Sequence, residues 1–552
     1  MTTTPRVHWW TSLALLSLGG LMAVVFFGAQ KSLPVISRPS EDANILRLAC
    51  VQNLSPDPQR RTSPYPAHNH FILSLWEPLI ECDPATGQPQ PAAAQSWEWS
   101  PDRLTLTLKL RPDARWSNGE PVSAHDFIRS WRRLLGQPIE LAQTLFPLKN
   151  AEAFHLGHLK DFGAVGMQAV DGLTLRLELS KVRSSLVAEL ADPLLSPLPE
   201  GSEQILADAS FFRDPTALVT NGPFRLQRAD YDGFRLLASP HYHGSRDVRL
   251  AGLRFIRVDY LALGQLLLAA GVVDIVSPMS YEERRLMPTE RQVKYEHELV
   301  LGVTTLDFNV SRGPLRDIRV RQALALALDR SRLTNKFNPG RMVPAWSWIP
   351  SMPGRPGLNL LKKNAEEARR LLAAAGYPAG RGFPVLEMSL PLWQRDNPYP
   401  AEWVETWYQE LGVRTHISHE PVAVRAKRMT AAGDYDLLYS SMVATVPDAG
   451  DLLSGFLWPS EINATKWVDK KMIGLLNEAN TLTGERRLAA LEKAEQLLMT
   501  AVPNVPVMFE RRQAMLAAEV QGWYPDPLAR QSLRRLWLEP ALANNSRREP
   551  GL

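Results

Sequence analysis

The sequence predicts an α/β protein that is divided into more than one domain. Its 552 residues are too many for one hydrophobic core of ordinary size, which favours two or three domains. From residue 299 onward, runs with the two-residue period of strands alternate with runs that have the apolar spacing of helices. Residues 253–276 show the same alternation over a short distance, as strand, helix and strand, and this order predicts parallel strands.

The composition is that of a folded globular protein. Charged residues make up 22% of the chain and hydrophobic residues 45%. The net charge is +4, and basic and acidic residues are interspersed without a basic block, which argues against a nucleic-acid partner. The 44 prolines indicate long irregular connections, and the 16 tryptophans indicate a large core or cavities lined by aromatic side chains.

An apolar run near the N-terminus, residues 13–29, predicts export from the cytoplasm. Two interpretations stay open, because Phe27-Gly28-Ala29 is a poor cleavage site and the run is long enough for a short membrane anchor. No cysteine follows the run, which excludes a lipoprotein anchor. We therefore expect residues 1–43 to form a signal sequence or anchor with a linker, and residues 546–552 to form a disordered tail.

The chain has two cysteines, Cys50 and Cys82. Such low use fits a large exported protein that needs no disulfide, and it also fits a reducing compartment. A disulfide between the two residues is one interpretation, and two buried free thiols are the interpretation that we favour.

In the N-terminal half, the clearest local pattern lies between residues 96 and 135. Leucines alternate with polar residues over 103–110 and predict a half-buried strand. Asn118-Gly119 predicts a turn, because both residues tolerate positive φ. Ser123, with Asp126 three residues later, predicts the capping box of a helix. The apolar face expected for this helix consists of Phe127, Trp131, Leu134 and Leu135.

Further elements are expected on both sides of this segment. Residues 44–52 predict the first strand and residues 70–79 a helix. Residues 171–179 repeat the pattern of residues 102–110, so we expect the two to be strands of one antiparallel sheet. The β-α-β unit is expected to place strands 253–259 and 272–276 side by side in parallel, joined by helix 261–270.

The C-terminal half alternates strands and helices throughout. Five strands are expected, at residues 299–308, 385–390, 413–417, 435–441 and 505–509. Five helices are expected, at residues 318–337, 364–375, 401–411, 422–432 and 485–499.

The chain lacks the sequence motifs of the common enzyme classes, including phosphate loops, zinc helices and nucleophile elbows. Asp448 and Asp451 form a carboxylate pair, but a loop Asp that caps a helix explains them better than acid–base chemistry. Solvated loop histidines likewise explain the histidine pairs better than metal ligands. These pairs are His68 and His70, His155 and His158, His241 and His243, and His416 and His419. The sequence therefore predicts binding without catalysis, metal or cofactor, and an exported hydrolase is the least favoured class.

Five segments in order carry a resemblance to a known family. Residues 116–131 resemble the signature W-S-D-G-x-P-V-T-A-x-D-F-x-x-S-W, with Asn118 in place of Asp and Ser123 in place of Thr. The other four segments are Thr220–Phe224 (T-N-G-P-F), Arg319–Arg330 (V-R-x-A-L-x-x-A-I-D-R), Ala365–Tyr377 (E-A-x-x-L-L-x-x-A-G-Y) and Leu491–Phe509 (K-A-E-Q-I-L and P-x-x-P-V). The chain thereby resembles the family 5 extracytoplasmic solute-binding proteins, the oligopeptide- and dipeptide-binding proteins of ABC transporters.

This resemblance implies a two-lobed periplasmic-binding-protein clamp of type II, cluster C, with an extra inserted α+β domain. The expected division is domain I at 44–75, 200–300 and 512–545, the inserted domain II at 76–199, and domain III, the second α/β lobe, at 301–511.

The resemblance also implies that a peptide or peptide-like solute is enclosed between the lobes and delivered to ABC permease subunits in the membrane. We expect a periplasmic or otherwise extracytoplasmic monomer that is not an enzyme. The ligand-binding residues expected from the resemblance are Tyr439, Ser441, Met442, Val443, Thr445, Trp393 and Thr62.

The departures from the family pattern concern the ligand. The peptide binders carry an Asp that pairs with the α-amino group of the peptide, whereas Thr445 stands at that position here. Met442 replaces a Trp, and Gly302 and Val443 occupy positions where some relatives have a disulfide. Residues 59–62 contain no acidic residue near the same amine. An alternative function is therefore a membrane-tethered sensor or accessory binding protein of the same fold with a non-peptide ligand.

Overall fold

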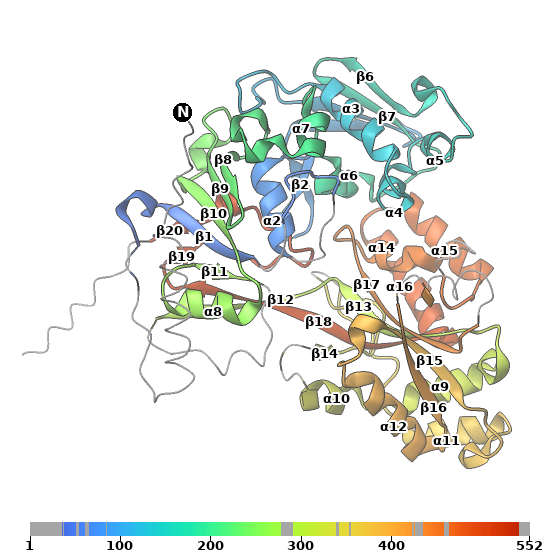
Figure 1. Ribbon diagram of the computed structural model, residues 1–552. Helices are drawn as coiled ribbons and strands as arrows, with labels where there is room; N and C mark the ends of the chain where they lie inside the picture. The colour runs from blue at the N-terminus through green and yellow to red at the C-terminus, as the bar shows by residue number, and fades with distance from the viewer. Residues whose placement is uncertain are drawn as a thin grey trace, which may run out of the picture.

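A single sheet of twelve strands passes through both lobes of the molecule (Figure 1). The computed structural model describes residues 36, 38–50, 54–60, 66–83, 86–277, 291–337, 340, 342–352, 355–421, 424–425, 434–456 and 463–539. The strand order is β16 (Thr415–Glu420), β15 (Leu386–Pro391), β17 (Leu437–Val443), β13 (Gly302–Phe308), β18 (Asn504–Ala517), β11 (Ile275–Val276), β1 (Ile45–Cys50), β10 (Gly252–Arg257), β9 (Gly233–Ala238) and β8 (Phe224–Asp230). Strands β12 (Val293–Leu299) and β14 (Met342–Pro344) also pair with β18.

The lobes are joined by an antiparallel ribbon made of β18 and the consecutive strands β12 and β13. The first half of β18 pairs with β13, and its second half pairs with β12, with Leu299 opposite Arg511. The ribbon continues across the junction, where the Val300 N–H donates to the Glu510 carbonyl oxygen at 2.9 Å. The sequence predicted only residues 505–509 as a strand, which was too short. The half-buried Glu510, Arg511 and Arg512 interrupt the apolar pattern at the junction between the lobes.

Each lobe has its own hydrophobic core. One cluster of buried side chains runs from Leu46 to Val276 and takes in Ala514 to Leu536, and it defines the N-terminal lobe. The other runs from Leu301 to Phe509 and includes Leu528, and it defines the C-terminal lobe. Residues of the expected inserted domain share the core of the N-terminal lobe. The domain limits expected from the sequence stay a prediction.

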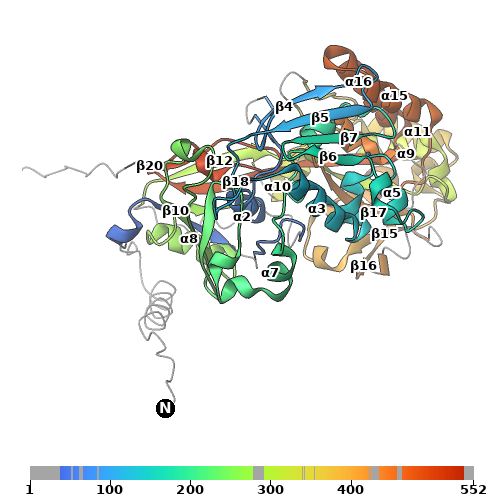
Figure 2. The same cartoon turned by 90° about the horizontal axis from the view of Figure 1, so that it is seen from above.

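The segment around residues 96–135 folds largely as the sequence predicts. Strands β4 (Ala94–Trp99), β5 (Thr105–Leu110), β7 (Thr174–Glu178) and β6 (Met167–Asp171) form one antiparallel sheet in that order (Figure 2). Helix α3 (Ala124–Leu135) begins at Ser123, whose N–H donates to the Asp126 carboxylate at 2.8 Å in the expected capping box. The four expected apolar side chains of α3 are buried.

The β-α-β unit differs from the prediction in one respect. Strands β10 and β11 are joined by α8 (Leu261–Ala269) and are parallel, but β1 lies between them and pairs with both. Residues far away in the sequence decide this pairing, so the local pattern did not reveal it. The remaining elements of the N-terminal lobe are α2 (Pro66–Leu75), β2 (Ile80–Cys82), β3 (Pro89–Pro91), α4 (Ile139–Ala142), α5 (Ala151–His155), α6 (Leu186–Glu189), α7 (Ser202–Asp208), β19 (Val520–Gln521) and β20 (Trp537–Leu538).

Two helix predictions were wrong. The helix expected at 70–79 is α2 and ends at Leu75, ahead of Pro78, which disfavours helical geometry at the residue before it. The helix expected at 318–337 is two helices, α9 (Ile318–Ala327) and α10 (Arg330–Phe337), separated by an extended Leu328. The break lets the buried Arg330 guanidinium donate to the Pro506 carbonyl oxygen on β18 at 2.7 Å.

Three further helices of the C-terminal lobe lie where the sequence predicts them: α11 (Ala365–Ala374), α12 (Tyr399–Leu411) and α16 (Gly484–Ala501). The helices α14 (Ala449–Leu453) and α15 (Lys470–Thr481) were not predicted. Most of the helix expected at 422–432 lies outside the described residues.

Both cysteines are free thiols, as favoured from the sequence, with Cys50 buried and Cys82 half-buried. Within the described ranges no helix is both long and apolar enough to cross a membrane, and the apolar run at 13–29 lies outside those ranges.

Trp131 tests how far the N-terminal lobe depends on α3. Its side chain is fully buried, and its indole N–H donates to the Leu195 carbonyl oxygen at 2.9 Å. We expect Trp131→Ala to lower the free energy of unfolding by about 3–5 kcal/mol, because it removes an aromatic side chain and leaves a cavity. Tyr408→Ala, at a side chain that is 52% exposed, is the control and should cost less than about 0.5 kcal/mol. Equal losses in urea titrations of the two variants would contradict this account.

Candidate functional site

Strand β17 has an edge that is only partly paired. Among the described residues, β15 pairs with β17 only at Leu437 and Leu438. On the other side, β13 follows β17 as far as Val443, and the Ala444 N–H donates to the Leu301 carbonyl oxygen at 2.8 Å. Successive residues of a strand direct their backbone groups to opposite sides. The N–H and C=O groups of Ser441 and Val443 therefore lie on the edge away from β13, and both residues are exposed.

An acidic side chain lies where the chain leaves this strand. Asp451, in the first turn of α14, accepts hydrogen bonds from the Thr445 N–H at 2.6 Å and from the Thr445 hydroxyl at 3.1 Å. Asp448 caps the same helix by accepting from the Gly450 N–H at 2.7 Å, as the sequence predicted, and it also pairs with Arg487 at 2.7 Å. The exposed Thr445 is thus bonded to a carboxylate that lies six residues further along the chain.

The other residues expected to bind ligand have different surroundings. Tyr439 is buried and stacks on Trp403, with ring centroids 5.9 Å apart, and burial raises the pKa of its phenol to about 12. Met442 is half-buried against the core of the C-terminal lobe. Thr62 and the side chain of Trp393 lie outside the described residues.

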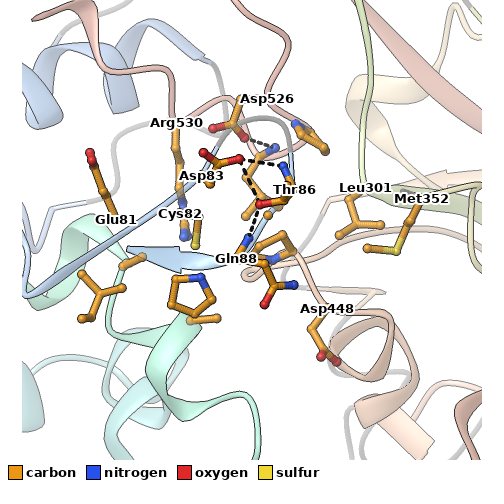
Figure 3. A pocket seen from close by; sticks show the side chains of 18 of the residues that line it. Glu81, Cys82, Asp83, Thr86, Gln88, Leu301, Met352, Asp448, Asp526 and Arg530 are labelled. Atoms are coloured by element: carbon orange, nitrogen blue, oxygen red, sulfur yellow. Dashed lines mark hydrogen bonds between the residues drawn. The ribbon is translucent and has the colours of Figure 1, made fainter. Parts of the chain in front are cut away.

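A cavity of about 700 Å³ lies between the lobes (Figure 3). From the N-terminal lobe, residues of β2, β3, α6 and the segment that follows β19, including Arg530, line the cavity. From the C-terminal lobe, it is lined by residues 350–352 and 447–449, Arg355 and residues of the first turns of α16, including Arg487. The connection at residues 298–301 forms part of its wall. The residues expected to bind ligand on β17 do not line this cavity, but the loop that follows Thr445 does.

The cavity wall at the junction of the lobes carries a carboxyl with a perturbed pKa. Glu298, near the end of β12, accepts from the Asp526 N–H at 3.1 Å and from the Gln531 side-chain amide at 2.6 Å. Burial raises the pKa of Glu298 to about 7, and it also raises the pKa of the neighbouring Asp526. Residue Gln531 in turn bonds to His70 on α2 at 2.9 Å.

The solvated-loop interpretation of the histidines was wrong for His68 and His70. Both are on α2 and are buried, and burial lowers the pKa of His70 to about 4, so that the ring is neutral. His243 bonds to the Glu77 carboxylate at 2.8 Å, within a network that includes Tyr242. In the described part of the chain, no three His, Cys, Asp or Glu side chains are grouped as metal ligands would be.

Sequence reasoning missed three features of this region. It did not place Asp451 beside Thr445, although the spacing from the capping Asp448 to the first helical turn was visible. It did not single out Arg425, which donates to the Tyr439 carbonyl oxygen at the edge of β17. It also gave no signal for Glu298, because its partners come from residues 526 and 531.

The family model of the bacterial extracellular solute-binding proteins, family 5, matches residues 88–464. The chain belongs to this family. Its role as an extracellular solute-binding protein follows from that membership, and the resemblance expected from the five sequence segments is confirmed.

Individual relatives agree with the family assignment. The probable deoxycholate-binding periplasmic protein YgiS of Escherichia coli is 27% identical, over 82% of this chain and 86% of that protein. The periplasmic oligopeptide-binding protein OppA of Haemophilus influenzae is 26% identical, over 88% of this chain and 93% of that protein.

Solved structures show the same fold. The murein tripeptide-binding protein MppA, in its unliganded open form, matches with a TM-score of 0.75 at 22% identity, over 92% of this chain and 99% of that chain. The complex of Haemophilus influenzae OppA with the peptide RPPGFSPFR matches with a TM-score of 0.67 at 23% identity, over 90% and 99% of the two chains. The predicted two-lobed clamp is therefore confirmed.

Glu298 gives a pH test of the junction between the lobes. Its carboxyl keeps its proton to a higher pH in the folded chain than in the unfolded chain, where the pKa is near 4.5. Its contribution to stability is therefore present below pH 4.5 and is lost as the pH rises through about 7. As the pH rises from 4.5 to about 7, the free energy of unfolding should therefore fall less in Glu298→Gln than in the parent protein. Urea titrations at several pH values measure this difference. Glu296→Gln on the same strand is the control, and an unchanged pH profile for Glu298→Gln would contradict the assignment.

Proposed function

We propose that this solute-binding protein serves an ABC importer, encloses peptides or peptide-like solutes between its lobes, and delivers them to a membrane permease. The observation that carries the proposal is the partly paired edge of β17. An extended peptide that lies along this edge pairs with the backbone groups of Ser441 and Val443, which is strand addition to a sheet. The names of the OppA and MppA relatives, which describe oligopeptide and murein peptide binding, agree with this ligand class.

Recognition by backbone groups suits a solute whose sequence varies. Hydrogen bonds to the main chain of a peptide are the same for every side chain, so they add affinity without selecting a sequence. The exposed side chains of Ser441, Val443 and Thr445 leave room for solute side chains and for bridging water. Met442 contributes to the wall of the site from its half-buried position, and we keep Trp393, Tyr439 and Thr62 as candidates for the surroundings.

The α-amino group of the solute requires a negative partner, and we assign this role to Asp451. Thr445 stands where relatives have an Asp, but the Asp451 carboxylate reaches the Thr445 side chain from the neighbouring helix. An ammonium group near Thr445 would therefore lie beside the carboxylate of Asp451, in place of the strand Asp of the relatives. This assignment explains how a chain without the strand Asp still binds a free peptide N-terminus.

The remaining parts of the proposal concern its cellular setting. We propose that the chain acts as a monomer without catalytic activity, cofactor or nucleic-acid partner. It works outside the cytoplasm, with residues 13–29 acting as a cleaved signal or as a tether to the inner membrane.

A second candidate keeps the clamp and changes the solute. One relative is named as a deoxycholate-binding protein and another, from Haemophilus influenzae, as heme-binding protein A. The departure at Thr445 favours this candidate, a tethered sensor or accessory protein with a non-peptide ligand. It differs from the first candidate in predicting that peptides do not bind.

A thermal-shift screen separates the two candidates. We expect mixed-sequence peptide pools of two to five residues to raise the melting temperature of the purified protein, because a ligand at 100 times its Kd adds about 2.7 kcal/mol of stability. A screen in which no peptide pool produces a shift, while a steroid acid or porphyrin does, would overturn the peptide assignment.

Asp451 is tested by charge removal and rescue. We expect Asp451→Asn to weaken binding of peptides with a free N-terminus about tenfold, because it removes the carboxylate that faces the ammonium group. N-acetylated peptides should bind the variant and the parent equally. Adding Thr445→Asp to Asp451→Asn should restore the affinity, as measured by calorimetry. If Asp451→Asn weakened the binding of free and N-acetylated peptides equally, and Thr445→Asp did not restore it, Asp451 would act only on the structure of α14.

A further inference from the structure

A row of arginines crosses the outer strands of the N-terminal lobe. Strands β8, β9 and β10 lie at the end of the sheet away from the C-terminal lobe (Figure 1). Their register places Arg228 opposite Arg235 and Arg235 opposite Arg254. Arg254 is in turn the partner of Arg47 on β1. Residues that are partners in register point to the same face of a sheet, so these four side chains form one arginine row. Strand pairing makes this row, and it leaves no basic block in the sequence.

The face that carries the arginine row is open to solvent over β8, β9 and β10. Arg254 is exposed, whereas its two neighbours along β10 are buried on the other face, and the side chain of Arg228 is 72% exposed. Helix α8 covers the same face over β1, where a Cβ atom on Gly264 would lie 3.2 Å from the Ala49 Cβ. Arg47 is therefore buried, and the other members of the row lie beyond the helix.

The carboxylates beside the arginine row neutralise it only in part. Arg228 pairs with Asp230 at 2.6 Å, and Arg235 pairs with Asp42 at 2.9 Å. Arg254, between them and β1, has neither a hydrogen bond nor an ion pair among the described residues. Like charges opposite one another on neighbouring strands are destabilising. An anionic surface against this face would remove that repulsion.

The N-terminal strap, residues 38–43, is fixed beside the arginine row. Its Arg38 donates to the Asp274 carboxylate at 2.7 Å, and Arg47 of the row donates to the same carboxylate at 2.7 Å. Just before the strap, the Ile36 N–H donates to a carbonyl oxygen at the end of α8 at 2.8 Å. The strap and the row thus share one buried carboxylate, so the chain enters the lobe next to the row.

The apolar run at residues 13–29 ends a short distance before this strap. Residue 36 follows the end of the run by seven residues, which span at most about 25 Å when fully extended. A membrane that held the run would therefore lie within this distance of the point where the chain enters the lobe. A tether of this length keeps the nearby face at a high effective concentration at the membrane surface.

We propose that the arginine row docks on the anionic surface of a lipid bilayer in which residues 13–29 are anchored. A negatively charged bilayer attracts each arginine near its surface, and the attraction falls off within a Debye length. The edge of β17 belongs to the other lobe, so the docked protein leaves that edge free. This docking goes beyond the proposed solute binding and rests on its tether alternative, in which residues 13–29 stay attached.

The test places the full chain in lipid nanodiscs that contain acceptor-labelled lipid. Gln227, exposed next to Arg228, is replaced by Cys in a Cys82→Ser background and carries a fluorescent donor. The fluorescence decay then gives the ratio of docked to undocked molecules. We expect a high ratio in discs with phosphatidylglycerol and a low ratio in discs of phosphatidylcholine alone. Raising the salt concentration from about 0.1 to 1 M should abolish the difference, because the Debye length falls from roughly 10 to 3 Å.

Single substitutions test the arginine row itself. We expect Arg254→Gln and Arg228→Gln each to lower the ratio about fivefold in anionic discs, which is the attraction expected for one arginine near such a surface. Arg254→Lys keeps the charge and should retain the ratio. Arg332→Gln, at an exposed position on α10 of the C-terminal lobe, is the matched control and should leave the ratio unchanged.

Equal ratios in anionic and zwitterionic discs would overturn the inference and leave an acidic protein surface as the candidate occupant of the row. Equal effects of Arg254→Gln and Arg332→Gln would also overturn it. Loss of the full chain from zwitterionic discs would do the same, because the tether would then be missing. The lipid comparison in the parent protein decides the matter even if a variant does not fold. None of these results bears on the peptide screen, so the proposed function fails or stands separately.

Discussion

The structure depends on one constraint, the pairing of β18 with both lobes. Its first residues belong to the sheet of the C-terminal lobe, and its last residues belong to that of the N-terminal lobe. The ribbon that it forms with β12 and β13 keeps its backbone hydrogen bonds through the junction at Glu510. The lobes can therefore change their relative orientation by bending or twisting this ribbon, but they cannot slide past each other without breaking its ladder. The partly paired edge of β17, which we propose as the solute site, and the inter-lobe cavity are both placed by this connection.

Sequence patterns predicted the fold where neighbouring residues determine it. The capping box of α3 and the two similar strands β5 and β7 depend on contacts that the local alternation and the turn residues specify. The patterns failed where distant segments decide the outcome. Strand β1 inserts between β10 and β11, and the helix expected at 318–337 breaks so that Arg330 reaches β18. The length of β18 was also missed, because three charged residues at the junction interrupt its apolar run.

The candidate site could be predicted only in part for a related reason. The resemblance led to β17, and the structure places Ser441 and Val443 at an exposed edge of this strand and the exposed Thr445 just beyond its end. The residues that give the edge its charge come from elsewhere, Asp451 from α14 and Arg425 from the segment before the strand. Neither stands in a recognised motif: Asp451 lies in the first turn of α14, and Arg425 lies between β16 and β17 in the sequence. A site made of backbone groups leaves little trace in the sequence, since every residue type supplies the same N–H and C=O.

The binding mode that we propose for the edge of β17 requires the lobes to enclose the solute. The N–H and C=O groups of Ser441 and Val443 offer four hydrogen bonds, and each adds only about 1 kcal/mol after the loss of bound water. Their sum of about 4 kcal/mol is half of the roughly 8 kcal/mol that micromolar binding requires. The rest has to come from charged groups and from apolar burial, and both gain strength when water is excluded. An open edge on one lobe cannot exclude water, whereas the opposing lobe can when the ribbon at β18 bends to bring it over the solute.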